Sequence, residues 1–172
     1  MRGKSIDAAS AIALLFSGTA QAVPAKSCLT ANEIHGLVAF ALPDVVDGMV
    51  KKCSATLRPD GYFNSQGSQL AERLAVGKDA AWPMASQAFR KFGDDFKGKP
   101  SATLSDRTLR AVIENEVVEK MLGDLPVKAC GDIEAIVQTL DPLPAENMIQ
   151  FVSAVLGVAG RGGNKLNACS PT

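Results

Sequence analysis

The sequence predicts an all-α fold, a compact bundle of about six to seven short helices arranged as αα-hairpins and crosslinked by two disulfides. Apolar residues recur at intervals of three and four along most of the chain, as on the buried face of a helix. No segment sustains the two-residue alternation that is typical of a strand. Four cysteines follow an N-terminus typical of exported proteins, which favours disulfides over free thiols.

The first 22 residues have the three parts of a signal peptide in the right order. Arg2 and Lys4 supply positive charge, residues 8–18 are apolar, and the small-x-small pattern of a cleavage site ends at Ala22. The apolar run is shorter than the roughly 20 residues that a membrane-spanning helix needs. We therefore expect cleavage after Ala22 and a periplasmic or secreted protein.

Cleavage leaves residues 23–172, a chain of 150 residues, which we expect to form a single helical domain with an irregular tail over 160–172. Two of the 18 basic and one of the 18 acidic residues lie in the leader, so the remaining chain has a net charge of −1. This balance gives no electrostatic reason to expect binding to nucleic acid or to an anionic membrane, and we expect no stable membrane insertion.

A capping box, in which Thr30 and Glu33 satisfy each other's backbone donors, predicts the start of the first helix. Its expected apolar face is Ile34, Leu37, Val38, Ala41 and Leu42. The residue before a proline is disfavoured in a helix, so we expect the chain to reverse at Leu42-Pro43. Pro43 then begins a second helix, whose apolar face is Val46, Met49, Val50, Cys53 and Leu57.

Further helices are expected, after a turn over 58–63, at about 65–76, 80–92, 106–122, 132–140 and 145–159. Pro83 sets the start of the second of these, because proline is tolerated only near the first turn. Ser105 caps the helix over 106–122, and its expected buried face is Leu109, Val112, Ile113, Val117 and Met121. In the last helix the expected face is Met148, Val152, Val155 and Leu156.

The four cysteines Cys28, Cys53, Cys130 and Cys169 show no C-x-x-C pair, so structural disulfides are the favoured interpretation. Four cysteines allow three pairings. A hairpin at Leu42-Pro43 brings Cys28 beside Cys53 and leaves Cys130 to pair with Cys169. If Pro43 only kinks one long helix, Cys28 and Cys53 lie too far apart to bond.

The sequence offers little catalytic chemistry. His35 is the only histidine and lies at the boundary of an apolar face, so we expect no metal site, no cofactor and no triad. Carboxylates that could serve a glycoside hydrolase are Asp94, Asp95, Glu114, Glu116 and Glu119. Oppositely charged neighbours on the helix over 106–122 make its outer face look ordinarily solvated.

Aromatic residues are sparse, and four of them fall within one short region: Trp82, Phe89, Phe92 and Phe96. Packing in the core is the default interpretation of such a set. The alternative is an apolar groove for a ligand or a partner.

The leading functional hypothesis is a non-enzymatic binding module, resembling inhibitors, immunity proteins or chaperones only in outline, whose partner is another exported or periplasmic protein. A carrier of a small apolar ligand or lipid is the alternative, and a carboxylate-based hydrolase is the third. A contiguous exposed apolar patch would favour the first hypothesis. A closed apolar cavity would favour the second, and two carboxylates facing each other across a cleft would favour the third.

Overall fold

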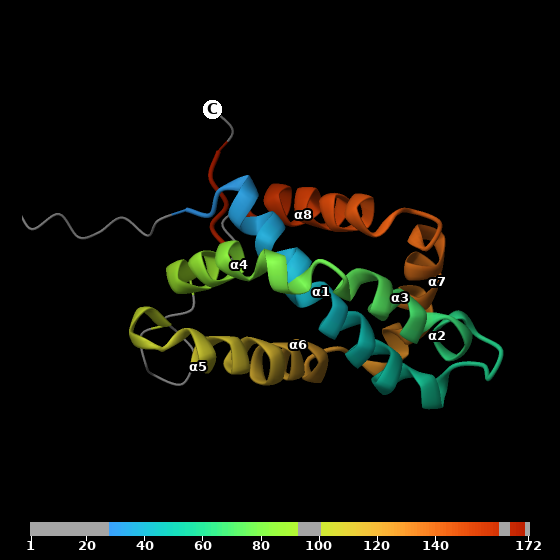
Figure 1. Cartoon of the computed structure of the whole chain (residues 1–172). Helices are drawn as coiled ribbons and strands as arrows, with labels where there is room; N and C mark the ends of the chain where they lie inside the picture. The colour runs from blue at the N-terminus through green and yellow to red at the C-terminus, as the bar shows by residue number, and fades with distance from the viewer. Residues whose placement is uncertain (1–27, 93–100, 162–165, 171–172) are drawn as a thin grey trace, which may run out of the picture.

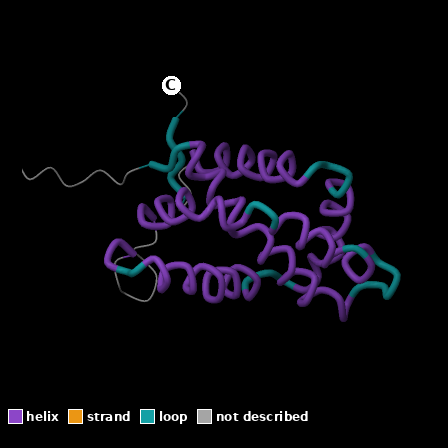
Figure 2. The backbone as a smooth tube through the Cα atoms, viewed as in Figure 1, coloured by secondary structure: helices purple, strands orange, loops and turns teal. Residues whose placement is uncertain are grey.

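The computed structural model describes residues 28–92, 101–161 and 166–170, and within these residues the protein is all-helical with two disulfides, as predicted (Figures 1 and 2). The signal-peptide prediction concerns residues outside these ranges. The α-helices are α1 (Ala31–Cys53), α2 (Tyr62–Ser65), α3 (Gly67–Ala75), α4 (Lys78–Phe92), α5 (Asp106–Ala111), α6 (Val118–Gly123), α7 (Cys130–Leu140) and α8 (Ala145–Arg161). A π-helical turn over Val112–Val117 joins α5 to α6, and short 3-10 turns cover Ser54–Thr56, Ser101–Thr103 and Val127–Ala129.

The long helix α1 is the centre of the fold. Helices α3, α4 and α8 all pack against it, and α6 reaches it from the side opposite α8 (Figure 1). The predicted capping box is present: the Glu33 amide donates to Thr30 Oγ1 at 3.3 Å, and the Thr30 amide donates to Glu33 Oε2 at 2.9 Å. The sequence thus specifies the start of α1 locally.

The predicted chain reversal at Leu42-Pro43 is wrong, because α1 continues through Pro43 to Cys53 as one helix of 23 residues. Proline inside a helix removes one backbone hydrogen bond and costs about 3 kcal/mol. Pro43 is buried, and the neighbouring Phe40 and Val46 are also buried. Packing around the middle of α1 therefore outweighs the local preference of proline.

The predicted cysteine pairing is wrong for the same reason. A helix of this length separates its ends by about 35 Å, so Cys28 and Cys53 cannot meet. Instead Cys28 bonds to Cys169, with 4.9 Å between their Cα atoms, and Cys53 bonds to Cys130, with 5.6 Å between theirs. Each disulfide fixes one end of α1 to a distant part of the chain.

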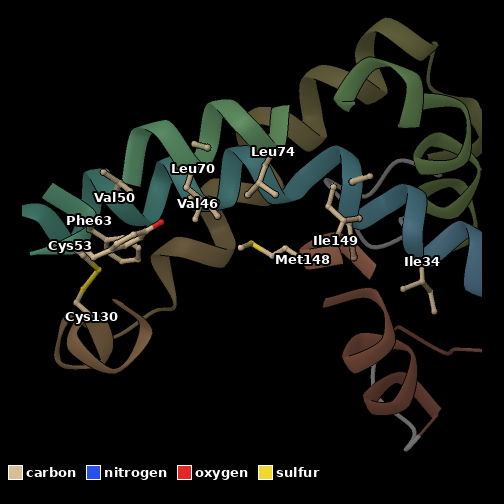
Figure 3. Packing of buried hydrophobic residues seen from close by; sticks show 14 of the residues in the cluster. Ile34, Val46, Val50, Cys53, Phe63, Leu70, Leu74, Cys130, Met148 and Ile149 are labelled. Carbon is tan, nitrogen blue, oxygen red and sulfur yellow. A yellow bond between two sulfur atoms is a disulfide. The ribbon is translucent and has the colours of Figure 1, made fainter. Parts of the chain in front are cut away.

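The core consists of two clusters on different sides of α1. The larger one joins α1 to α3, α7 and α8, and Figure 3 shows Leu70, Leu74 and Met148 directed toward α1, with the Cys53–Cys130 disulfide at one end. The smaller cluster consists of Phe40, Ala85, Phe89, Leu109 and Ile113, and it joins α1 to α4 and α5.

The helix predicted over 106–122 exists, but its buried face differs from the predicted one. Ile113 is fully buried, as expected, and packs in the cluster of Phe40 from α1. The π-helical turn then advances the face by one residue, so Val118 is buried, Val117 is half-buried and Met121 is exposed. A period of 3.6 residues, which we assumed throughout, does not hold across such a turn.

Smaller differences concern α4 and α8. Helix α4 begins at Lys78, so Pro83 lies within the helix and not in its first turn. In α8 Met148 is buried as expected, but Val155 and Leu156 are exposed. The outward position of Val155 is the first indication that α8 has an unusual surface.

Candidate functional site

The surface of α8 that faces away from the core is apolar. Met148 and Ile149 pack onto α1 and α3, while Phe151, Val155 and Val158 are 50%, 51% and 62% exposed. Together with the exposed Ala154, these residues have the spacing i, i+3, i+4, i+7, and we call them the α8 stripe. In Figure 1, α8 lies along the upper edge of the molecule with no described helix above it.

Beside the stripe lies a groove of about 790 Å³ between α8, the first turns of α1 and the segment 168–170, which we call the α1–α8 groove. Its lining is mainly apolar and includes Leu29, Ile34, Gly157 and Ala168. Ala154 and Val158 belong to both the stripe and the groove, so the two surfaces are continuous.

The wall formed by the C-terminal segment depends on contacts that are distant in sequence. The Leu29 amide donates to the Asn167 carbonyl at 2.9 Å, and the Cys169 amide donates to the Leu29 carbonyl at 2.9 Å. These hydrogen bonds form an isolated β-bridge between Leu29 and Ala168, and the Cys28–Cys169 disulfide lies directly beside it. These links hold the segment against the entry of α1, so one side of the groove is covalently fixed.

Polar groups lie at the two ends of α8. Near its start, His35 Nε2 lies 3.5 Å from Glu146 Oε1, and Gln150 Nε2 donates to the same oxygen at 3.3 Å. At its end, Arg161 lines the groove, and no ion-pair partner for it lies among the described residues. From Asn147 to Gly160 the helix carries no charged residue. The surface is therefore apolar in the middle, with an acid at one end and a base at the other.

Glu33, which is hydrogen-bonded to the groove-lining Thr30, links α1 to α4. Its carboxylate is 2.7 Å from Lys91 Nζ, and the side chain is nearly buried. Burial alone would raise the pKa of Glu33, but hydrogen bonds from Lys91 and Thr30 together outweigh it and hold the pKa below its usual value. This ion pair therefore fixes Thr30, which lines the groove, to α4.

A second, more polar hollow of about 420 Å³ lies between α1 and the α5–α6 segment. Two of its carboxylates pair with Lys78 of α4, whose Nζ is 2.7 Å from Asp44 and 3.1 Å from Glu114. Lys52 Nζ donates to the Leu122 carbonyl, and Lys51 pairs with Asp47. The contacts of Lys78 crosslink α1, α4 and the π-helical turn, which is typical of structural ion pairs.

Of the carboxylates considered for hydrolysis, Glu114 and Glu119 both line this more polar hollow, together with Asp44 and Asp47 of α1. Glu114 accepts a hydrogen bond from Arg110 and forms an ion pair with Lys78, which is typical of a structural role. Glu119 is exposed on α6. Asp94 and Asp95 lie outside the described residues. Among the described residues no group of three or more His, Cys, Asp or Glu side chains could hold a metal ion.

The aromatic set is only partly described. The Trp82 ring lies 4.9 Å from that of Phe40, and Phe89 is buried in the smaller core cluster. The side chain of Phe92 and all of Phe96 fall outside the described part, so a groove formed by all four residues stays a prediction.

Sequence reasoning missed the α8 stripe, although a signal for it was present. Helix α8 has apolar residues on more than one face, and one helix face suffices for packing on a core. Phe151 and Val158 were the residues left over. Their position on the outside depends on where α8 docks, which the sequence does not indicate.

We found no protein-family model, no curated protein and no solved structure that matches this chain. Within the described ranges, none of the helices is both long and apolar enough to span a membrane.

Proposed function

We propose that this protein is a non-enzymatic binding module that acts outside the cytoplasm. The α8 stripe and the α1–α8 groove form its binding surface, and the bound group is an apolar helical segment of an exported protein. The observation that carries the proposal is the face of α8 that no other described element covers, with three large apolar side chains at least half exposed at helical spacing. Exposed apolar residues scattered singly are ordinary, but a contiguous set flanking a groove is typical of an interaction site.

The physical driving force is the removal of this apolar surface from water, worth about 25 cal/mol per Å² buried. A partner helix suits the site because an amphipathic helix presents side chains at the same i, i+3, i+4, i+7 spacing. A membrane surface suits it less, because the polar ends of α8 carry one acid and one base and no cluster of lysines or arginines.

Action outside the cytoplasm rests on two supports. The N-terminal sequence has the pattern of a signal peptide, and the two disulfides are chemically suited to an oxidising compartment. N-terminal sequencing of the exported protein tests this part: we expect Val23 as the first residue, and recovery of Met1 would contradict export.

Site-specific photocrosslinking tests the binding surface. A photoreactive residue at Val158 is expected to form discrete adducts in the exported fraction, and the same residue at Val76 is not. Val76 is a suitable control because it is 88% exposed and lies outside the α8 surface. Mass spectrometry of the adduct identifies the bound species. Equal labelling at both positions, or no adduct at Val158, would argue against this binding surface.

A carrier of a small apolar ligand is the second candidate, favoured by the size and lining of the groove. Ligand sites are typically about 300–1,000 Å³ and predominantly apolar, and the groove of about 790 Å³ lies in this range. Native mass spectrometry of the exported protein tests it. A bound small molecule that is lost when Gly157 is replaced by Leu would support this candidate, and a protein free of ligand would oppose it.

A further inference from the structure

We infer that the segment which covers the α8 stripe is α8 of a second copy of this chain, packed antiparallel about a two-fold axis near Ala154. This inference rests on the proposed function, because it names the occupant of the same surface. Three features of α8 support it independently: its ends, its shape and its apolar centre.

The ends of α8 are complementary in charge. Glu146 lies in the first turn and Arg161 in the last, with no charge between them. In an antiparallel pair the acid of each copy faces the base of the other, whereas a parallel pair would bring like charges together. The midpoint between positions 146 and 161 falls at Ser153 and Ala154, which is also the centre of the α8 stripe. The charged ends and the apolar centre therefore share one two-fold axis.

The two halves of the α8 surface are complementary in shape. The N-terminal half carries one large exposed side chain, Phe151. The C-terminal half carries the smaller aliphatic side chains of Val155, Leu156 and Val158, and the small residues Ala154 and Gly157 line the hollow of the groove. Antiparallel packing about an axis at Ala154 places Phe151 of one copy opposite Gly157 of the other, over the groove. Each copy thus supplies one projection and one hollow, which is the self-complementarity that a two-fold interface requires.

Gly157 is not required by packing within one chain. A Cβ atom at this position would approach only Ile34 Cδ1, at 3.8 Å, which is an ordinary contact. Glycine in a helix interior lowers stability by about 0.5–1 kcal/mol relative to alanine. In the dimer Gly157 keeps the hollow open for Phe151 of the second copy, which explains a glycine that packing within the monomer does not require.

The α8 surface is small for a stable protein–protein interface. A helix of 17 residues is about 25 Å long and about 10 Å wide, so a single helix pair buries less than the roughly 1,200 Å² of a stable interface. The dimer is therefore expected to be weak and to dissociate on dilution.

Sedimentation velocity of the purified, disulfide-bonded protein, followed over increasing concentration, tests the inference. We expect a shift from monomer to dimer, and Val155→Glu is expected to weaken association at least about tenfold because it places like charges near the axis. Val76→Glu, at an exposed site elsewhere, is the matched control and leaves the shift unchanged. Val155 is half exposed, so its substitution leaves the fold intact, which circular dichroism confirms before the measurement.

A charge swap tests the orientation. Arg161→Glu alone is expected to weaken the dimer, and the double variant Glu146→Arg with Arg161→Glu is expected to restore it. The double variant also lacks the contact between His35 and Glu146, so restoration cannot come from that contact. A dimer that the double variant leaves weakened would contradict the antiparallel arrangement.

The inference and the proposed function fail in distinguishable ways. A protein that stays monomeric at every concentration, or a dimer insensitive to Val155→Glu, overturns the two-fold inference. If the photocrosslinker at Val158 still captures a different exported protein, the proposed function stands. If it forms no adduct and the protein is monomeric, both are wrong.

Discussion

Helices α1 and α8 are the two longest in the described part of the chain, and they use similar apolar patterns differently. Helix α1 is surrounded by α3, α4, α6 and α8, and its ends are tied by both disulfides. Among the described elements α8 packs mainly against α1 and α3, and another side of it exposes the α8 stripe. Apolar periodicity alone therefore indicates a helix without indicating whether its apolar residues serve the core or an interface.

The two helices also differ at the residues that disfavour helical structure, Pro43 in α1 and Gly160 in α8. α1 contains Pro43 and is continuous, because its neighbours compensate for the lost hydrogen bond. α8 ends near Gly160, which is buried against Ala168 of the C-terminal segment. Substitutions in α1 should therefore act on stability, and those on the outer face of α8 should act on association.

The largest expected effect on the free energy of unfolding comes from removing the Cys53–Cys130 disulfide, which lies at the C-terminal end of α1. Replacing Cys53 and Cys130 by Ala opens a crosslink over 77 residues, which should cost about 4–5 kcal/mol if loop entropy dominates. The pair Cys28 and Cys169 spans 141 residues and has a slightly larger loop term. Cys53 and Cys130 are buried, however, whereas Cys28 and Cys169 are only partly buried. We therefore expect removal of the shorter crosslink to cost at least as much in denaturant titration; a much smaller loss would contradict the anchored α1.

The second prediction compares two phenylalanines. Phe40 of α1 is fully buried, lies 4.9 Å from Trp82 and has the cations of Lys78 and Arg110 over its ring. Phe40→Ala should lower the free energy of unfolding by about 3–5 kcal/mol. Phe151→Ala on α8 should change it by less than about 0.5 kcal/mol at concentrations where the protein is monomeric. Similar losses for both, measured by urea titration, would show that the outer face of α8 is part of the core.

The third prediction compares two glycines. A Cβ atom at Gly36 would overlap Met84 Cβ and lie 3.1 Å from the Ala85 amide nitrogen, so Gly36→Ala forces α1 and α4 apart. We expect a loss of about 1–3 kcal/mol, as for other overpacked sites. Gly157→Ala on α8 makes only an ordinary contact with Ile34 Cδ1 within the monomer and should add about 0.5–1 kcal/mol of stability. The same variant should weaken the dimer, because it partly fills the hollow; thermal unfolding and sedimentation measure the two effects separately.

The sequence predicted the helices well where local signals agree with packing. The caps at Thr30 and Ser105 are present, and the helices over 132–140 and 145–159 differ from α7 and α8 by two residues at most. Ile113 is in the core as expected. Helix caps and apolar faces depend on the spacing of residues that are close in sequence, and this spacing can be read directly from the sequence.

The errors arose where tertiary contacts override a local preference. The predicted break at Pro43 is wrong, and the pairing of Cys28 with Cys53 that depends on it is wrong as well. The π-helical turn over Val112–Val117 has no distinct local signal, so Met121 was placed inward. The α8 stripe was missed because the sequence does not show which side of α8 meets α1. All three depend on how the helices dock against one another.

The smallest expected effect is a pH dependence of the stability that Glu33 contributes at the start of α1. Glu33 has a lowered pKa in the folded protein, because hydrogen bonds from Lys91 and Thr30 outweigh the effect of burial. A group with a lowered folded pKa adds stability above its unfolded pKa of about 4.3, and this contribution is lost as the pH falls through the folded pKa. Glu33→Gln keeps the shape and the capping hydrogen bonds but removes the charge, so we expect a loss of about 1 kcal/mol near neutral pH. The difference from the parent protein should shrink below about pH 4 as Glu33 becomes neutral.

Urea titrations of both proteins between neutral and acidic pH measure this difference. Glu146→Gln is the matched control, because Glu146 occupies the first turn of α8 and its side chain is 61% exposed. Exposed ion pairs contribute little to stability, so this variant should follow the parent protein closely at every pH. A difference for Glu33→Gln that persists at low pH would mean that shape, and not charge, joins α1 to Lys91. A pH-dependent loss in Glu146→Gln as large as that in Glu33→Gln would show that the start of α8 is as firmly integrated as that of α1, against the contrast between the two helices.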